Sequence, residues 1–499
     1  MNRFLLALFS AAVPGLLCAG NPTRLFPEPQ ATDVNPDTRL VLTFPEAVQL
    51  GSSGCIRVFD AQSGELVDLL DLSIPAGPTE RTIDLPDADY IRSPYVYESR
   101  RITNKNTKPG TPSSYNAPDE RNFQLTIIGG FSDGFHFYPV LVEGNRATIC
   151  LHHNLLEYGK TYCVMIDPEV FGNFGGIAGR DVWTFSTKRQ APDPQQRVLT
   201  VAADGSGDFS TLQGAMDFIP DFLADESERR TVRVAAGDYC ELVYFRNKNY
   251  VTIEGAGAGE TVVHYANNEV FNPHPRDIKT NELKGTFPSR RAAVAADNCC
   301  HLILRDITFR TDCSGQAEGL LLNGDHNFAE RVRIIGSGDA LQVNGSAYWL
   351  NCCIEGDADT VLGRGPSFFN RCTLISRHAF MWIRNTEENH GNVFVSCTFR
   401  GTGDGTTAFI AKTASNGSKH YAHQESVLIN CVLDNVPAFG WSHASPELAT
   451  AHLWEFNSTD AAGNPIDSSG RNPYARQLDA VKDAELIGNY SNANYVLGW

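Results

Sequence analysis

The sequence predicts an all-β protein in two parts, a β-sandwich over residues 22–190 and a parallel β-helix over residues 197–499. Short alternating apolar runs separated by Gly, Asp and Asn indicate the sandwich in the first part. In the second part, β-rich runs recur about every twenty residues without intervening helices, which is typical of a solenoid of stacked strands. A chain of 499 residues is also too long for one ordinary compact core, so its length indicates two domains or one very elongated domain.

The first part opens with "RLVLTFPEAVQL" and ends in "DVWTFSTK". These runs resemble the bacterial Ig-like domains, in which a "TF" strand near the start and a "W-x-F-x-T" strand at the end bracket the fold. The resemblance implies an Ig-like β-sandwich. Within it, residues 88–122 form a polar insertion rich in Tyr, Asn and Pro, which we expect to be a loop. The polar, proline-containing segment "RQAPDPQQR", 189–197, is the predicted linker.

Cysteines mark the repeat of the second part. The segments "NCCIEG", "NRCTLI", "VSCTFR" and "INCVLD" place Cys353, Cys372, Cys397 and Cys431 in similar contexts. Val332 lies 21 residues before Cys353, and Cys372 lies 19 residues after it. We interpret this series as one inward-facing file of small buried side chains. Removal of Cys18 with an export signal would leave twelve of the thirteen cysteines, and an even count in an exported protein also suggests disulfides.

An exposed end of a solenoid must be covered, because it presents unpaired strand edges. The apolar spacing of "STLQGAMDFIPDFLADES", residues 210–227, predicts a helix that caps the first end. The C-terminal segment "YARQLDAVKDAELIGNYS" has two possible positions. It covers the other end or packs along the side.

The N-terminal segment "MNRFLLALFSAAVPGLLCAG", residues 1–20, has the pattern of a secretory signal peptide. A lipid anchor on Cys18 is the alternative, but Leu17 stands where a small residue is wanted. No later segment is apolar for long enough to cross a membrane. We therefore expect a secreted or periplasmic protein that is a monomer.

Charge and motif content exclude several functions. The net charge of -17 and the lack of a Lys/Arg cluster argue against nucleic-acid binding. A polyanionic substrate would need a locally neutral or basic groove. No CxxC motif or His/Cys grouping suggests a metal site, and no "G-x-S-x-G" motif suggests a serine esterase.

Two aspartates stand out against this background. Asp339, in "GSGDALQV", lies 359 - 339 = 20 residues before Asp359, in "IEGDADTVLG". One coil of twenty residues would place them in register on neighbouring rungs, roughly 5 Å apart. Two carboxylates that close in a partly dehydrated groove cannot both ionise freely, so one becomes an acid and the other a base or nucleophile. Spacing alone leaves open that both are turn aspartates.

Five segments of the second part match a known family. The segments "VAADGSGDFSTLQGAMDFIP", "AAGDYCELVYF", "QAEGLLLNGD", "GSGDAL" and "GDADTVLG" resemble the motifs of the pectinesterases, or pectin methylesterases. The likeness covers about 197–499 and implies a right-handed parallel β-helix that hydrolyses the methyl esters of galacturonate in pectin without a metal or organic cofactor. It further implies that Gln316 binds the oxyanion, Asp339 is the general acid/base and Asp359 is the nucleophile.

The motifs also depart from the family pattern. Gly338 stands where the family has a second glutamine, and Lys412, in "FIAKT", stands where an arginine would hold the nucleophile. Since Lys cannot form the two-pronged contact that Arg makes to a carboxylate, these changes affect the expected rate and substrate preference. Trp382, Arg384 and Arg364 are the candidate substrate-binding residues, because a ring can stack on a sugar and a guanidinium can bind a carboxylate. Core packing of Trp382 and a solvated turn role for Arg364 remain alternatives.

Two other functions fit the same architecture. A polygalacturonase also uses paired aspartates, but its "N-T-D", "G-H-G" and "R-I-K" motifs are absent from the sequence. A non-enzymatic pectin-binding β-helix would explain the missing glutamine and arginine as lost catalysis.

Overall fold

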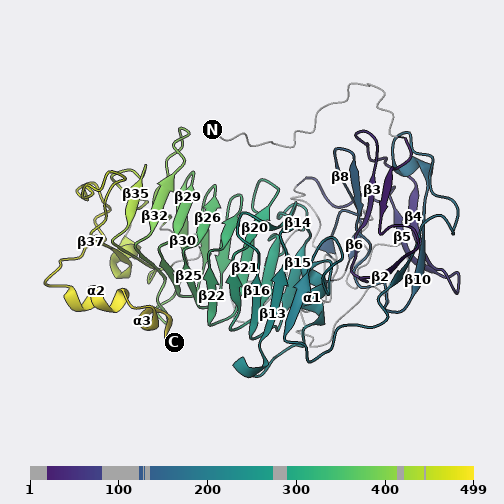
Figure 1. Cartoon of the computed structure of the whole chain (residues 1–499). Coiled ribbons are helices and arrows are strands. Elements are labelled where there is room, and N and C mark those ends of the chain that lie inside the picture. The colour runs from purple at the N-terminus through teal and green to yellow at the C-terminus, as the bar shows by residue number, and fades with distance from the viewer. Residues whose placement is uncertain are drawn as a thin grey trace.

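Three long sheets of parallel strands form most of the molecule (Figure 1). The computed structural model describes residues 20–80, 123–126, 128–129, 135–272, 289–412, 421–442 and 446–499. The predicted signal peptide, apart from Gly20, and the predicted insertion at 88–122 lie outside these residues. Among the residues that are described, no helix has the length and apolar character needed to span a membrane.

The three sheets share one topology, in which each strand pairs with the strand of the next coil. The first sheet contains β12 (Val198–Val201), β13 (Arg230–Val234), β16 (Val251–Glu254), β19 (Ile303–Arg305), β22 (Asn327–Glu330), β25 (Ala347–Leu350), β28 (Ser367–Asn370), β31 (Asn392–Val395), β34 (Glu425–Ile429), β36 (His452–Phe456) and β37 (Ala475–Gln477). The second contains β14 (Gly237–Cys240), β17 (Thr261–Tyr265), β20 (Thr308–Thr311), β23 (Arg333–Ile335), β26 (Cys353–Gly356), β29 (Thr373–Ser376), β32 (Thr398–Gly401) and β35 (Val432–Asp434). The third contains β15 (Val243–Arg246), β18 (Val294–Asp297), β21 (Leu320–Asn323), β24 (Leu341–Val343), β27 (Val361–Gly363), β30 (Ala379–Ile383) and β33 (Phe409–Lys412).

The chain visits the three sheets in turn, which makes a parallel β-helix and confirms the predicted fold class. Crossovers between parallel strands of one sheet are right-handed in almost all proteins, in accord with the predicted right-handed coil. The predicted period is also confirmed in the central coils. Ile334 pairs with Ile354 and Ile354 with Leu374, so that each step is twenty residues. Leu341 and Val361 pair with the same step in the third sheet.

One member of the predicted inward cysteine file was wrong: the inward residue is Cys352 and not Cys353. Cys353 begins β26 and is half-buried, whereas its neighbour Cys352 is 2% exposed and packs in the core with Cys372, Cys397 and Cys431. With Cys352 in the file, the steps from Val332 and to Cys372 are both twenty residues. All twelve cysteines of the described residues are free thiols. The backbone N–H of Cys352 donates to the Cys372 sulfur at 3.4 Å, so the file is linked by hydrogen bonds.

The N-terminal part is a sandwich of two sheets around a separate apolar core (Figure 1). One sheet has the order β1 (Arg24–Phe26), β3 (Leu40–Thr43), β9 (Arg146–Ile149), β8 (Val140–Glu143). The other has the order β2 (Ala31–Val34), β11 (Thr184–Thr187), β10 (Thr161–Ile166), β4 (Cys55–Asp60), β5 (Leu66–Asp71). A short pair, β6 (Leu125–Thr126) and β7 (Phe135–His136), lies beside them. The predicted β-sandwich is present, and its Ig-like identity stays a prediction. Residues 189–197 form neither helix nor strand, as expected of a linker, and β12 begins at the next residue, Val198.

Few helices accompany the strands. They are α1 (Leu212–Phe218), α2 (Ala484–Tyr490), α3 (Ala493–Leu497) and the 3-10 turns η2 (Pro168–Val170), η3 (Glu226–Glu228) and η4 (Pro446–Thr450). The helix predicted over 210–227 ends at Phe218. Pro220 accounts for this, because a residue before proline avoids the helical region, and Ile219 is extended with ψ 132°.

Both predicted caps can be located. Helix α1 packs on β12 and β15 of the first coils, at the end that faces the sandwich (Figure 1). The C-terminal helices lie along the side of the β-helix, which decides between the two predicted positions. Tyr490, Val496 and Leu497 pack there on Phe368 and Val427 of the first sheet.

The corrected cysteine file leads to a stability prediction. We expect Cys352→Ser to lower the free energy of unfolding by about 1–3 kcal/mol, because it places a hydroxyl in an apolar core. The matched control is Cys353→Ser, one residue away and half-buried, which should change the melting temperature much less. Thermal unfolding of both variants checks the assignment. A larger loss of melting temperature in Cys353→Ser than in Cys352→Ser would show that Cys353 is the inward residue.

Candidate active site

The candidate site lies where two neighbouring strands of the third sheet begin. Asp339 stands two residues before β24 and Asp359 two residues before β27, and Leu341 is paired with Val361. The two aspartates therefore occupy equivalent positions on adjacent coils, as the spacing predicted. Ser337 and Asp357, also twenty residues apart, meet directly, since the Ser337 hydroxyl donates to the Asp357 carboxylate at 2.8 Å.

Asp339 is the more buried of the pair, at 6% exposure. The pKa of Asp339 is raised to about 7, mainly by burial; the positive charge of Arg291 opposes the rise, and the negative charges of Glu318 and Asp359 add to it. Sequence reasoning expected this shift from partial dehydration and from the neighbouring Asp359. The structure makes burial the main cause and adds the charge of Glu318, which is fully buried.

Asp359 has a different environment. Its backbone is in the left-handed region, with φ 48°, and its side chain is 15% exposed. The Lys412 ammonium donates to its carboxylate at 3.4 Å, as predicted. Burial raises the pKa of Asp359 above its usual value, while the positive charges of Lys412, Arg384 and Arg291 oppose the rise.

Sequence reasoning missed the guanidinium that connects this site. Arg291 donates from Nε to both oxygens of Glu318 at 2.8 and 3.0 Å, from Nη1 to Glu269 at 2.8 Å, and from Nη2 to Asp339. Arg291 precedes β18, two coils before β24, so no local motif joins it to Asp339. Glu318 and Asp339 lie on later coils than Arg291, so its place in the site can be predicted only once the coil register is known.

Gln316 and Gly338 lie on two turns that contact each other. The Gln316 side chain is exposed, and the neighbouring Ala317 exchanges two backbone hydrogen bonds of 2.9 Å with Ser337. Gly338 has φ 75°, and a Cβ built there would lie 2.6 Å from the Gly315 carbonyl oxygen. A glutamine at position 338 is therefore incompatible with this backbone. Another amide, Gln342 of β24, is 1% exposed, and its Oε1 has no hydrogen-bond partner among the described residues.

The predicted substrate-binding residues form a cationic cluster beside Asp359. Trp382 of β30 pairs in register with Lys412 of β33. The Arg384 guanidinium lies 3.6 Å, and the Lys412 ammonium 4.5 Å, from the centre of the Trp382 ring. Trp382 is only 7% exposed, so cations rather than solvent cover its surface. Arg364, immediately after β27, is half-buried. The pKa of Arg384 is lowered mainly by the burial of Arg384 itself, and the positive charge of Arg364 lowers it further.

The arrangement can perform acid/base and nucleophilic chemistry. One carboxyl titrates near neutrality, a second is paired with an ammonium, and positive charges surround both.

Comparisons with known proteins agree with the β-helix part of this description. The pectinesterase family model matches residues 198–498. A pectinesterase of Ralstonia solanacearum is 30% identical over 296 residues, which cover 52% of this chain and 71% of the relative. A pectinesterase of Arabidopsis thaliana is 29% identical over 308 residues, with 58% and 75% covered. The solved pectin methylesterase from carrot has a TM-score of 0.49 and 21% identity, over 60% of this chain and 92% of that chain. The chain belongs to the pectinesterase family and is a carboxylic ester hydrolase of that family.

Proposed function

We propose that the chain removes methyl esters from galacturonate residues of pectin, with Asp359 as nucleophile and Asp339 as general acid and base. The observation that carries this proposal is the pair of carboxylates at equivalent positions on adjacent coils, in different electrostatic environments. A carboxyl with a pKa of about 7 can give and take a proton near neutral pH. A carboxylate beside an ammonium is available to attack.

The reaction follows from these two roles. The Asp359 carboxylate attacks the ester carbonyl carbon and forms a tetrahedral intermediate. The bond to the methoxy oxygen then breaks, and methanol leaves with the proton of Asp339, so that an anhydride with Asp359 remains. Water gives one proton to Asp339 and attacks the acyl carbon, which breaks the anhydride, restores the Asp359 carboxylate and releases galacturonic acid, whose remaining proton passes to solvent.

The negative charge on the carbonyl oxygen needs donors, and Gln316 is the first candidate, as the family resemblance implies. Its exposed side chain is free to turn, and its turn is fixed against that of Asp339 by the Ala317–Ser337 contact. Gln342 is the candidate to replace the second glutamine, because it lies on β24, the strand that follows Asp339. Its register partners on the neighbouring strands of the third sheet are Leu321 and Leu362.

Positive charge near the site supports an anionic substrate. The chain carries a net charge of -17, yet Arg384 and Lys412 lie together next to Asp359, with Arg364 close by. We propose that Arg384 and Arg364 bind free galacturonate carboxylates. The structure favours a different role for Trp382 than sugar stacking, since its ring holds the two cations in place.

Two further expectations concern the rest of the chain. We propose that residues 1–20 direct export, which would bring the enzyme to a pectin substrate outside the cytoplasm. We also propose that residues 22–190 are an Ig-like domain and that the enzyme acts as a monomer.

Substitution of the two aspartates tests the proposed roles. We expect Asp359→Asn to lower the rate of methanol release from methylated pectin by about a thousandfold or more, because an amide does not attack the ester. Asn tolerates the left-handed backbone of position 359, so the fold should persist. Asp339→Asn should also abolish turnover. Wild-type rates in both variants would remove the aspartates from the mechanism.

The same assay separates the alternative functions. We expect the wild-type chain to release methanol from methylated pectin without forming new reducing ends. Reducing ends without methanol would indicate a polygalacturonase, and retention on pectin with neither product would indicate a binding protein.

The pH dependence of turnover tests the electrostatics. Because Asp339 must be protonated to release methanol, the rate should fall as pH rises through about 7. Glu318→Gln removes a neighbouring negative charge, so it should lower the pKa of Asp339 and move this alkaline limb to lower pH. Glu355→Gln, an acid on the second sheet, is the control and should leave the profile unchanged. An unshifted limb in Glu318→Gln would exclude Asp339 as the titrating group.

The position of Lys412 tests the departure from the family pattern. Arg can make a two-pronged contact to a carboxylate, so Lys412→Arg should retain activity, whereas Lys412→Met should lower kcat about tenfold to a hundredfold. Steady-state kinetics on methylated pectin would measure both. Equal rates in the two variants would show that the positive charge near Asp359 is dispensable.

A further inference from the structure

We propose that Cys240, His264 and Asp312 bind one Zn²⁺ ion on the first coils of the β-helix, where these meet the β-sandwich. This site is separate from the ester-hydrolysing residues and goes beyond the proposed function. The sequence has no CxxC motif or His/Cys grouping that would suggest this site. The three residues lie 24 and 48 positions apart in the sequence, so only the coil register brings them together.

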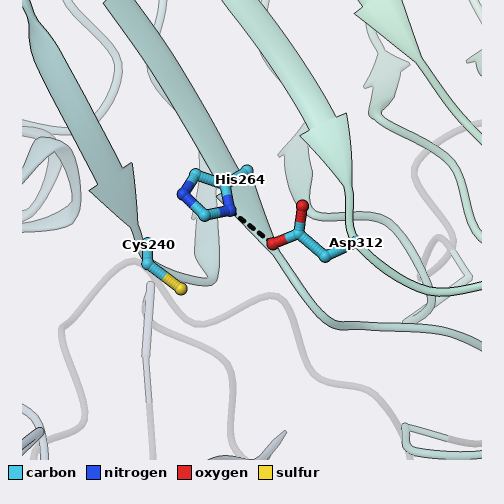
Figure 2. A group of neighbouring side chains, drawn as sticks. All are labelled: Cys240, His264 and Asp312. Carbon is cyan, nitrogen blue, oxygen red and sulfur yellow. Dashed lines mark hydrogen bonds and ion pairs between the residues drawn. The ribbon is translucent and has the colours of Figure 1, made fainter. Parts of the chain in front are cut away.

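Strand pairing explains how the three side chains meet. Cys240 at the end of β14 is the register partner of His264 on β17, and His264 is the partner of Arg310 on β20. Asp312 lies two residues beyond Arg310, which returns its side chain to the same face. Figure 2 shows the three side chains grouped over neighbouring strands, with a ring nitrogen of His264 turned towards Asp312.

Distances within the group fit a small cation. The Cys240 sulfur, a ring nitrogen of His264 and an Asp312 oxygen all lie within 4.8 Å of one another. Ligands at the usual zinc bond lengths of a tetrahedral site are about 3.5 Å apart, so small side-chain adjustments suffice. A thiolate, an imidazole and a carboxylate together favour zinc over calcium or magnesium, which prefer oxygen ligands only.

The surroundings of the group match those of a metal ligand set. His264 is 4% exposed, and its Nδ1 is bonded to Asp312, while its Nε2 lies 2.7 Å from an oxygen of Asp238 without the geometry of a hydrogen bond. A carboxylate on the far nitrogen is the usual way to orient a metal-binding histidine. Arg310 donates from Nε to Asp312 Oδ1 at 2.8 Å and leaves Oδ2 directed at His264.

The location gives the ion a role. Cys240 and Asp238 line a cavity of about 110 Å³ between the β-helix and the sandwich, which Glu143 and Arg146 line from the sandwich side. Cys240 is the proposed ligand that lines this cavity, which has room for a water molecule. The ion would connect three successive strands, β14, β17 and β20, at the end of the solenoid where the next coil is missing. Binding would release the thiol proton of Cys240 to solvent.

A competing explanation uses the same histidine without a metal. A protonated His264 between Asp238 and Asp312 would form two ion pairs and would not involve the sulfur of Cys240. The two explanations therefore differ in what Cys240 does, and thiolate-specific measurements separate them.

Cobalt binding to the full-length chain tests the proposal. The purified protein is treated with a chelator under reducing conditions and titrated with Co²⁺, whose bond to a thiolate gives a strong near-ultraviolet absorption band. We expect this band at one equivalent in the wild type and in the control Cys353→Ser, and we expect Cys240→Ser to lack it. No band in the wild type, or an equal band in Cys240→Ser, would overturn the site.

Thermal unfolding gives a second, independent result. Added Zn²⁺ should raise the melting temperature of the metal-free wild type and of Cys353→Ser, because an ion that binds only the folded chain stabilises it. It should not raise that of Cys240→Ser, which should release methanol at the wild-type rate at low temperature. An equal rise in Cys240→Ser would show that zinc binds elsewhere.

Discussion

The register between successive coils is the constraint on which the active site depends. Parallel strands hold neighbouring coils at about 4.8 Å, and a step of twenty residues then places chemically matched positions next to each other. Within the central coils this step brings together Asp339 and Asp359, Ser337 and Asp357, and the sulfur atoms of Cys352 and Cys372. One inserted residue before Asp359 would move its side chain to the other face or out of the row, because side chains alternate along a strand.

Burial of several acids in one place requires compensation, and Arg291 provides it. Glu318 is fully buried and Asp339 nearly so, and unpaired carboxylates in such a position would be strongly destabilising. Arg291 donates to both and to Glu269 as well, which fixes the carboxyl group of Asp339 in one orientation. The opposing effects of burial and of this guanidinium leave Asp339 with a pKa near 7. Structural support and catalytic tuning are here the same set of contacts.

The sequence was sufficient for the features that repeat locally. The period, the solenoid, the sandwich and the pair of aspartates all follow from short segments whose spacing is regular. It was insufficient where a single residue decides the face of a strand, as with Cys352 and Cys353, since both are cysteines and only the pairing distinguishes them. It was also insufficient for contacts across irregular coils. Arg291 and Asp339 are 48 residues apart over two coils, in which Val294 pairs with Leu320 and Leu320 with Leu341, so the steps are 26 and 21 residues. His264 and Asp312 are 48 residues apart within one coil, in which Val262 pairs with Thr308 after 46 residues.

The missing second glutamine is explained by the same close packing of turns. Gly338 takes a left-handed backbone, and the Gly315 carbonyl lies where a side chain would begin. This approach allows Ala317 and Ser337 to exchange backbone hydrogen bonds, and that contact holds the turn of Gln316 beside the turn of Asp339. A glutamine at position 338 would push the two turns apart and displace Gln316. The chain therefore keeps one glutamine on this pair of turns instead of two, and under the proposed mechanism a second oxyanion donor would come from another segment. Gln342, on the strand that Asp339 precedes, is the amide placed to supply it.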